Sequence, residues 1–164
     1  MERFGFCQTP VGTLKIVQQG EAIVQISLYT STLSNIYGVQ TTPLIQLAIG
    51  QLEEYFTTPH TTFQLPLAPE GTDFQKKVWR ALCEIPYGET RTYGQIAKQI
   101  GHPKAFRAVG LANHNNPIPI VIPCHRVIGA NNMLTGYAYG LSIKQQLLDW
   151  EIKHKPIVSS EIIL

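Results

Sequence analysis

A single cysteine stands between a proline and a histidine at the end of a short apolar run. The run is Pro-Ile-Val-Ile-Pro over residues 119–123, and Cys124, His125 and Arg126 follow it directly. A thiolate is the nucleophilic form of cysteine, and an adjacent imidazole is one of the few groups that generate it near neutral pH. A buried structural cysteine is the alternative, but polar residues follow at once. The stretch therefore predicts a nucleophilic thiol.

The residues before Cys124 should fix the direction of its side chain. The run is too short for a helix and carries a proline at each end, which is typical of a buried extended segment. Pro123 restrains its own backbone and biases Ile122 toward extended geometry. We therefore expect an extended segment that ends at the thiol.

A carboxylate near the C-terminus is a candidate partner for the histidine. Ile143, Leu147 and Glu151 are four residues apart in an expected helix, which a capping box at residues 142–145 would open. This spacing places Glu151 on the inward face, where an unpaired carboxylate is costly. We expect it to pair with His125, and an exposed, frayed helix end is the alternative.

Two short helices before Cys124 form a candidate helix-turn-helix. A capping box at Thr92 and Gln95 opens the first helix. Residues 101–103 read as a tight turn with His102 a possible N-cap, and the second helix is expected over residues 104–113. Structural α-hairpins have similar sequences, so DNA binding and a purely structural role are both consistent with this motif.

The second of these helices combines small residues with one line of larger ones. Lys104, Arg107, Leu111 and His114 are spaced by three, four and three residues, which places them on one face. Arg107 is either a solvated surface arginine or a side chain that contacts phosphate or enters the DNA stack. Small residues elsewhere let another surface approach the backbone closely: Ala105, Ala108, Gly110 and Ala112.

The N-terminal half shows no motif with chemistry and is expected to be scaffold. Strands are predicted near residues 4–7, 14–17 and 22–28, with a hairpin turn at residues 19–21. Residues 30–41 are polar and ambiguous.

A helix and a possible fourth strand should follow. Thr42 is an N-cap with Pro43 at the first helical position, and a further short strand is possible at residues 63–67. Residues 69–71, Pro-Glu-Gly, make the best domain boundary in the chain, and a capping box at Thr72 and Gln75 should open a helix after it. The expected apolar stripe of the helix is Leu44, Leu47, Ala48, Leu52, Tyr55 and Phe56.

Composition narrows the class of protein. The chain has 164 residues and a net charge of +2, but residues 1–72 carry −3 and residues 73–164 carry +5. A basic C-terminal half favours an anionic partner, nucleic acid first. No apolar run approaches the roughly 20 residues of a membrane span, and no signal-like N-terminus is present, so a soluble cytoplasmic protein is expected. Three scattered cysteines indicate neither a disulfide framework nor a zinc site.

Together these motifs resemble the O6-alkylguanine-DNA alkyltransferases, also called methylated-DNA–protein-cysteine methyltransferases. The N-terminal half agrees only in its order of elements. The resemblance implies an α+β fold: a small ribonuclease H-like α/β domain with an antiparallel sheet over residues 1–71, then a mainly helical, winged-helix-like domain over residues 72–164. The matching segments are Phe74–Trp79, Ile85–Thr90, Arg107–Gly110, Asn116-Pro117, Pro123–Val127 and Glu151.

The resemblance also implies a reaction. Cys124 would take the alkyl group from guanine O6, and from O4-alkylthymine, and keep it as a thioether. His125 would act through a water as the base, with Glu151 orienting the imidazole. Tyr93 would donate a proton to the leaving guanine, and Asn116 would hold the turn that shapes the pocket. The protein would react once and need no cofactor.

The family flips the damaged nucleotide out of double-stranded DNA through the minor groove. Arg107 would take the vacated place in the stack, and binding would be salt-sensitive with little sequence preference. A monomer is expected. The implied DNA contacts are Thr92, Tyr93, Ala105, Arg107, Ala108 and Arg126.

The implied substrate pocket contains one departure from the family. Its residues are Tyr93, Val127, Tyr137, Ala138 and Tyr139, and relatives usually carry two adjacent glycines where Tyr139-Gly140 stands here. Tyr139 should narrow the entrance or stack on the substrate, which puts benzyl-sized groups in doubt more than methyl. Some relatives bind zinc in the N-terminal half, which here offers only Cys7 and His60, so no metal site is expected.

Two other functions compete with alkyl transfer. An alkyltransferase-like sensor would flip damaged guanine without reacting, but such relatives lack the acceptor cysteine that this chain has. A Cys–His hydrolase or redox thiol protein would leave the helix-turn-helix, Tyr93 and Arg107 unexplained.

Overall fold

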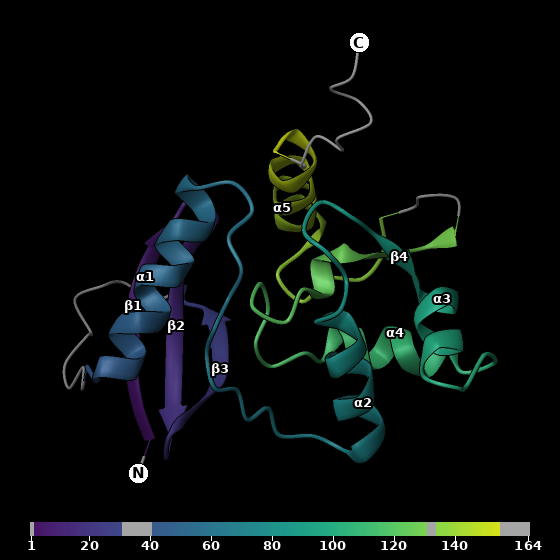
Figure 1. Ribbon diagram of the computed structural model, residues 1–164, viewed down its shortest axis with the longest axis horizontal. Coiled ribbons are helices and arrows are strands. Elements are labelled where there is room, and N and C mark those ends of the chain that lie inside the picture. The colour runs from purple at the N-terminus through teal and green to yellow at the C-terminus, as the bar shows by residue number, and fades with distance from the viewer. Residues whose placement is uncertain (1, 31–40, 131–133, 155–164) are drawn as a thin grey trace, which may run out of the picture.

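The computed structural model describes residues 2–30, 41–130 and 134–154. Figure 1 shows a sheet with one covering helix on one side, a group of short helices on the other, and the last helix above the junction. The ambiguous segment at residues 31–40, part of the loop expected before the last helix (131–133) and the tail from residue 155 lie outside the described residues.

The N-terminal part is an antiparallel sheet in the order β1-β2-β3. The strands are β1 (Glu2–Thr9), β2 (Gly12–Gln19) and β3 (Ala22–Leu28), as the alternating pattern predicts. Cys7 pairs with Leu14, and Ile16 with Ile26, and all four are buried. The sheet thus has one apolar face against which a helix must pack.

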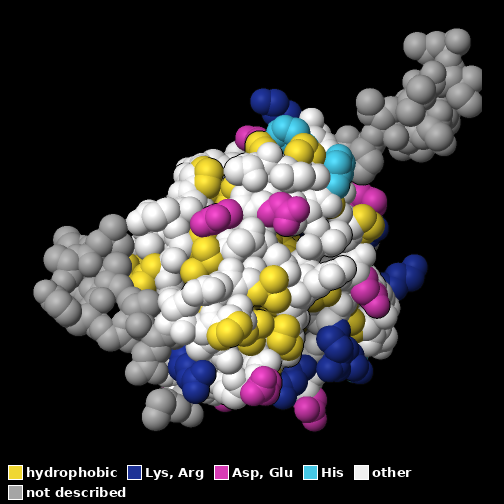
Figure 2. Space-filling view, turned by 60° about the vertical axis from the view of Figure 1, so that its left-hand side comes forward, with side chains coloured by type: hydrophobic (Ala, Val, Ile, Leu, Met, Phe, Trp, Pro, Cys, Tyr) yellow, Lys and Arg dark blue, Asp and Glu magenta, His cyan; other side chains and the backbone are white. Residues whose placement is uncertain are grey.

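That helix is α1 (Pro43–Thr57), and Thr42 caps it by accepting a hydrogen bond from Ile45 N at 3.0 Å. The expected stripe is wrong at one position. Leu47 is 50% exposed, and Ile45 is buried in its place beside Ala48, Leu52 and Tyr55. Spacings of three, four and three residues keep these four on one face. Figure 2 shows this side of the molecule, where hydrophobic side chains reach the surface in small groups.

The segment after α1 does not form the predicted strand at residues 63–67. Within the described residues only Leu67 bridges β3, with Ile23 N donating to Pro66 O at 2.9 Å. Side chains in this segment alternate between half-buried and exposed, which is the pattern that suggested a strand. Pro66 and Pro69 have no N–H to extend the pairing.

The C-terminal part begins with α2 (Asp73–Leu82), opened by the predicted capping box of Thr72 and Gln75. β4 (Arg91–Thr92) and α3 (Tyr93–Gln99) follow, and the second predicted capping box is also present. Trp79 of α2 donates from Nε1 to Ala112 O at 2.9 Å, which fixes α2 against the helix after α3.

The second helix of the pair, α4 (Phe106–His114), starts two residues later than predicted. His102 is not its N-cap: Ala105 holds that position, and no hydrogen bond from a described side chain caps it. Ala105 N donates to His102 O at 2.9 Å, so Pro103 lies in a separate turn. The connection between the helices is therefore residues 100–105, longer than the expected turn.

The run before Cys124 is a tight loop and not the expected extended segment. Ile122 N donates to Ile118 O at 2.9 Å, and Ile120 adopts a left-handed backbone with φ of +74°. Asn116 closes the loop, because its Nδ2 donates to Ile122 O at 2.8 Å and its Oδ1 accepts from Ile118 N at 2.9 Å. A 3-10 turn, η2 (Cys124–Arg126), then presents the cysteine.

A short strand and a longer helix complete the fold. β5 (Val127–Ile128) runs parallel to β4. The last helix is α5 (Leu141–Lys153), whose N-cap is Gly140 with φ of +95°. The predicted capping box at Ser142 is wrong, since the N-cap lies two residues earlier, at Gly140, with no hydrogen bond from a described side chain. None of the helices described here is long and apolar enough to cross a membrane.

The two parts meet along β3, whose backbone would otherwise form an open edge. Ile26 N donates to Pro117 O at 2.9 Å, and Ile26 O accepts from Tyr139 Oη at 2.7 Å. Both partners belong to loops that flank the Cys124 turn in the chain. The sheet thus holds these loops from one side.

Candidate active site

Cys124 is the first residue of the η2 turn and is 2% exposed. Burial raises the pKa of its thiol to about 11, although the Asn116 side chain and the positive charge of Lys144 act in the opposite direction. The resting sulfur is therefore protonated at neutral pH, and the expectation of a thiolate already formed by the neighbouring imidazole is not met. A base must remove the proton when the sulfur reacts.

His125 is the buried base next to it. Its Nε2 lies 2.6 Å from Glu151 Oε2, and both side chains are almost fully buried. An ionised carboxylate only accepts hydrogen bonds, so Nε2 carries the proton and Nδ1 holds the free electron pair. Nδ1 is buried and has no hydrogen-bond partner among the described residues. The predicted pairing of His125 with Glu151 is thus present.

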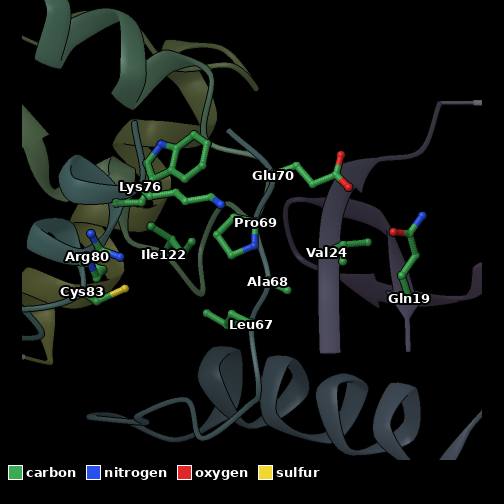
Figure 3. A pocket seen from close by; sticks show the side chains of 11 residues that line it. Gln19, Val24, Leu67, Ala68, Pro69, Glu70, Lys76, Arg80, Cys83 and Ile122 are labelled. Carbon is green, nitrogen blue, oxygen red and sulfur yellow. The ribbon is translucent and has the colours of Figure 1, made fainter. Parts of the chain in front are cut away.

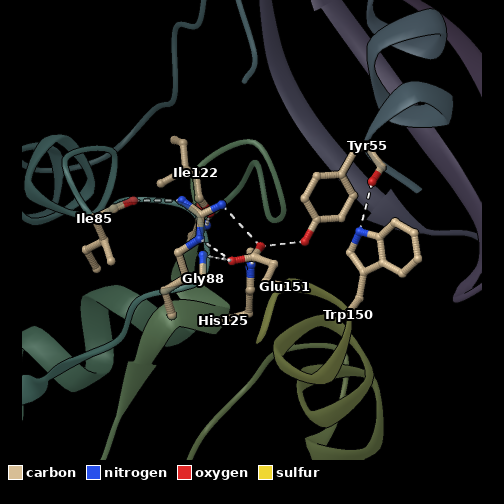
Figure 4. Close-up of polar contacts among 9 residues, drawn as sticks. Tyr55, Ile85, Gly88, Ile122, His125, Trp150 and Glu151 are labelled. Carbon is tan, nitrogen blue, oxygen red and sulfur yellow. Dashed lines mark hydrogen bonds and ion pairs between the residues drawn. The ribbon is translucent and has the colours of Figure 1, made fainter. Parts of the chain in front are cut away.

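Glu151 accepts hydrogen bonds from three parts of the fold, α1, the loop after α2 and η2, as drawn in Figure 4. Oε2 accepts from Tyr55 Oη at 2.5 Å, and Oε1 accepts from Gly88 N at 3.2 Å. Arg126 donates from Nε to Oε1 at 2.7 Å and from Nη2 to Oε2 at 3.1 Å. We call Glu151 and its four donor residues, Tyr55, Gly88, His125 and Arg126, the acid cluster.

The acid cluster sets the charge of both titrating partners. Burial alone would raise the pKa of Glu151, but the charges and hydrogen bonds of His125 and Arg126 hold that pKa well below its usual range. Burial lowers the pKa of His125 below 6.5, and the opposing effect of Glu151 does not reverse this. At neutral pH the cluster therefore holds an ionised Glu151 and a neutral His125 with an available Nδ1.

Arg126 belongs to this buried cluster and not to the DNA-contacting surface where the resemblance placed it. It is 8% exposed, and its Nη1 also donates to Ile85 O at 2.7 Å. A guanidinium engaged by a carboxylate and a backbone carbonyl in the interior is not available to phosphate. The expectation for Arg126 is therefore corrected: it neutralises Glu151.

Two asparagines fix the thiol-bearing turn from the α4 side. Asn116 closes the loop before Cys124. This is the role that the family resemblance implies for it. Asn113, at the end of α4, donates from Nδ2 to Cys124 O at 3.3 Å. Both asparagines are buried, so hydrogen bonds in the interior connect the end of α4 to the reactive turn.

Tyr93 lies at the start of α3 and is half-buried. Its hydroxyl donates to Thr135 O at 3.1 Å, and Gly136 lies beside it, since a Cβ there would be 3.7 Å from the Tyr93 oxygen. Burial raises the pKa of the Tyr93 phenol, and Cys124 contributes in the same direction. The phenol is therefore protonated at neutral pH, as a proton donor must be.

The remaining expected pocket residues differ in their exposure. Val127 and Tyr137 are buried and Ala138 is exposed. The Tyr139 hydroxyl donates a hydrogen bond to Ile26 O. Its ring packs edge-to-face against Tyr137, with 5.7 Å between the ring centroids. Tyr139 thus anchors the loop before α5 to the N-terminal sheet.

The face of α4 away from the core is open to solvent. Arg107, Ala108, Leu111 and His114 of α4 are all exposed, with Leu111 at 63%, and so is Lys104 in the connection before the helix. We call these five residues the recognition face. Thr92 and Ala105 are half-buried at its margin. Cations and small side chains together on an exposed helix suit close approach to a phosphate backbone.

Both parts of the chain match models of one protein family. Residues 3–69 match the ribonuclease-like domain of 6-O-methylguanine DNA methyltransferase, and residues 73–153 match its DNA binding domain. A methylated-DNA–protein-cysteine methyltransferase of Mycobacterium tuberculosis is 45% identical over 150 residues, which cover 90% of this chain and 91% of that relative. The chain belongs to this family.

Other members of the alkyltransferase family match over different extents. The methyltransferase of Methanosarcina mazei is 68% identical over 102 residues, but the match spans 62% of this chain and only 65% of the length of that relative. The crystal structure of Mycobacterium tuberculosis OGT in complex with DNA matches with a TM-score of 0.81 and 44% identity over 94% of each chain. The two-domain α+β fold is therefore that of the alkyltransferases.

Three polar residues of this alkyltransferase chain were missed by sequence reasoning. Tyr55 was assigned to the apolar stripe of α1, and Asn113 was taken as the end of a helix. Lys144 is fully buried, and its Nζ donates to Val127 O at 2.5 Å and to Thr135 O at 2.7 Å. Burial lowers the pKa of Lys144 to about 8. In the sequence, only the position of Lys144 next to Ile143 of the helical stripe indicated that its side chain could be buried.

A large cavity lies elsewhere, between the two parts of the molecule. It has a volume of about 560 Å³ and is lined by β2 and β3, by the segment Leu67–Glu70 and by α2. Figure 3 shows Lys76, Arg80 and Cys83 on one side of it. The cavity reaches Ile122, but Cys124 is not among its lining residues. No group of three or more potential metal-binding side chains occurs within the described ranges.

Proposed function

We propose that the protein repairs double-stranded DNA by moving the alkyl group of O6-alkylguanine, and of O4-alkylthymine, onto Cys124. Its relatives are named for methylated DNA and a protein cysteine, which supports this assignment. The observation that carries it is the neutral His125, held by Glu151 at 2.6 Å through Nε2 with Nδ1 free, directly after a buried thiol. This is an acid–base–nucleophile order suited to a displacement.

The reaction is one displacement at carbon. His125 Nδ1 takes the thiol proton through one water, the sulfur attacks the methyl carbon, and the bond from that carbon to guanine O6 breaks. The electron pair of that bond stays on guanine, which receives a proton from the Tyr93 hydroxyl. A general acid in this position typically contributes about 10²–10⁴-fold. Proton return from His125 to Tyr93 through solvent leaves guanine, a thioether and no other product.

A thioether has no route back to the thiol within this set of residues, so we propose that each molecule reacts once. No cofactor takes part in this scheme, because the alkyl group is already activated by its attachment to the guanine oxygen.

The buried position of Cys124 means that the damaged base must leave the helix to reach it. We propose that Arg107 on the recognition face occupies the vacated place, and that α4 enters the minor groove. The exposure of Arg107 and of Ala108 beside it supports this arrangement. Flipping costs a few kcal/mol, which the inserted arginine offsets in part. The family match to an OGT–DNA complex supports DNA as the partner.

We propose further that the boundary between the two functional parts lies at residues 69–71 and that the protein acts as a cytoplasmic monomer. The separate family matches, which end at residue 69 and begin again at residue 73, support the boundary.

The test is mass spectrometry after mixing the protein with duplex DNA that contains O6-methylguanine. The peptide bearing Cys124 should gain one methylene unit, reach one equivalent per protein and then stop. Turnover without a mass change would instead identify a hydrolase. Tight binding of the lesion with unmodified protein would identify a sensor.

A further inference from the structure

One tyrosine of the N-terminal domain contacts two consecutive residues of the last helix. Tyr55 Oη donates to Glu151 Oε2 at 2.5 Å, and Tyr55 O accepts from Trp150 Nε1 at 3.0 Å (Figure 4). Tyr55 lies on α1 and is fully buried. It is therefore the residue through which the N-terminal domain reaches the acid cluster.

The hydroxyl of Tyr55 acts on the same carboxylate oxygen as His125. Glu151 Oε2 accepts from Tyr55 at 2.5 Å and from His125 at 2.6 Å. A donor on this oxygen withdraws part of the negative charge that would otherwise stabilise an imidazolium, and it restricts rotation of the carboxylate. Burial, followed by the charge of Glu151, raises the pKa of Tyr55 well above 10, so the hydroxyl remains a donor at physiological pH.

We propose that Tyr55 is a positioning residue for the transfer reaction, which sets the basicity of His125 by sharing Glu151 Oε2 with it. This rests on the proposed transfer to Cys124. Through this contact the scaffold domain determines the pH range in which the base functions.

Several other groups affect the charges of Glu151 and His125. Arg126 from η2, Tyr87 from the loop after α2 and Tyr137 from the loop before α5 face Glu151, and Lys144 from α5 acts with Arg126 on His125. Among the described residues, only the Tyr55 hydroxyl and Arg126 Nη2 donate to Oε2 beside His125. Substitution of Tyr55 therefore changes this oxygen and leaves the ion pair with Arg126 in place.

The test is the pH profile of the single-turnover rate of methyl transfer from duplex DNA. Tyr55→Phe removes one oxygen atom and keeps the ring. We expect the rate at neutral pH to fall about tenfold, the order expected for one hydrogen bond to a charged group. The acid limb of the profile should move to higher pH by about half a unit, because the unshared carboxylate raises the pKa of His125.

A matched control is Trp150→Phe, which removes the neighbouring hydrogen bond to Tyr55 O and leaves the carboxylate untouched. It should lower the thermal midpoint without moving the acid limb. Site-specific replacement of Tyr55 by 3-fluorotyrosine, a stronger donor, should move the limb in the opposite direction, to lower pH. This variant keeps the native packing and tests the proposal even if Tyr55→Phe folds poorly.

The outcomes separate the two levels of the proposal. If the wild-type protein does not methylate Cys124, the proposed function fails. A second outcome is that the wild-type protein transfers the group while the acid limb of the pH–rate profile is the same in both Tyr55 variants as in the wild type. That result overturns the role of Tyr55 and leaves the proposed function standing. A rate loss that is uniform over the pH range would also overturn it, since loosened packing alone would produce that result.

Discussion

The acid cluster and the recognition face lie in one small protein but are built in opposite ways. In the acid cluster four residues surround one buried carboxylate, and most of the polar atoms have fixed partners. On the recognition face five side chains are exposed. Chemistry on a single bond requires fixed, desolvated groups, whereas contact with any DNA sequence requires charge and a close backbone approach. The two tasks are thus separable by mutation.

The largest expected effect removes the chemistry and leaves the face intact. Cys124→Ser should abolish the mass gain completely, because an alcohol in this site is a far poorer nucleophile than a thiol. Its affinity for duplex DNA containing O6-methylguanine should stay within about twofold of wild type, measured by fluorescence anisotropy. A large loss of affinity would show that the buried turn also supports the recognition face.

The second effect breaks the acid cluster. Glu151→Gln places an amide N–H₂ among donors that need an acceptor, so transfer should slow by about a hundredfold. Unfolding free energy should fall by about 3 kcal/mol, because Arg126 is left as an uncompensated buried charge. Stopped-flow transfer rates and urea denaturation measure these losses. Unchanged stability would contradict the buried ion pair.

The third prediction removes a side chain from the recognition face and leaves the acid cluster intact. Arg107→Ala should slow repair of duplex DNA by about tenfold, since the side chain no longer offsets part of the cost of flipping. Reaction with the free base O6-methylguanine should stay within about twofold, because no flipping is needed there. Lys104→Ala is the matched control for loss of one cation on the same face. Equal losses on both substrates would count against insertion.

The smallest effect uses pH to distinguish the two regions. Because the pKa of His125 is lowered from 6.5 by burial, its neutral form is present above pH 6.5 and is lost as pH falls through the lowered value. The transfer rate should therefore be nearly constant from about pH 8 to about pH 7 and decline only in the acid range. Binding measured separately at each pH should not follow this decline. A rate that rises steeply with pH up to the thiol pKa would indicate that His125 is not the base.

Sequence patterns predicted the features that depend on neighbouring residues. The caps at Thr42, Thr72 and Thr92 and the three strands were correct because caps and alternation act over a few residues. The order of elements was also correct, and the family resemblance gave the fold class. Glu151 was placed inside by helical spacing alone.

The features that failed depend on partners far away in the chain. The turn at Ile120 is closed by Asn116 across six residues, so the apolar run looked extended. Arg126 looked like a surface cation because its carboxylate partner lies 25 residues later. The role of Tyr55 depends on a contact across 96 residues. A tyrosine in an apolar stripe carries no signal that its hydroxyl has a partner.

Burial of the Cys124 sulfur has a consequence for the lifetime of the repair protein. Oxidants and free electrophiles attack thiolates, and a thiol with a pKa of about 11 is almost entirely uncharged in the cell. Under the single reaction proposed for Cys124, a molecule is wasted if peroxide or another electrophile reaches its sulfur first. The sulfur stays shielded and protonated until a damaged nucleobase enters the site, and this reserves each molecule for a lesion.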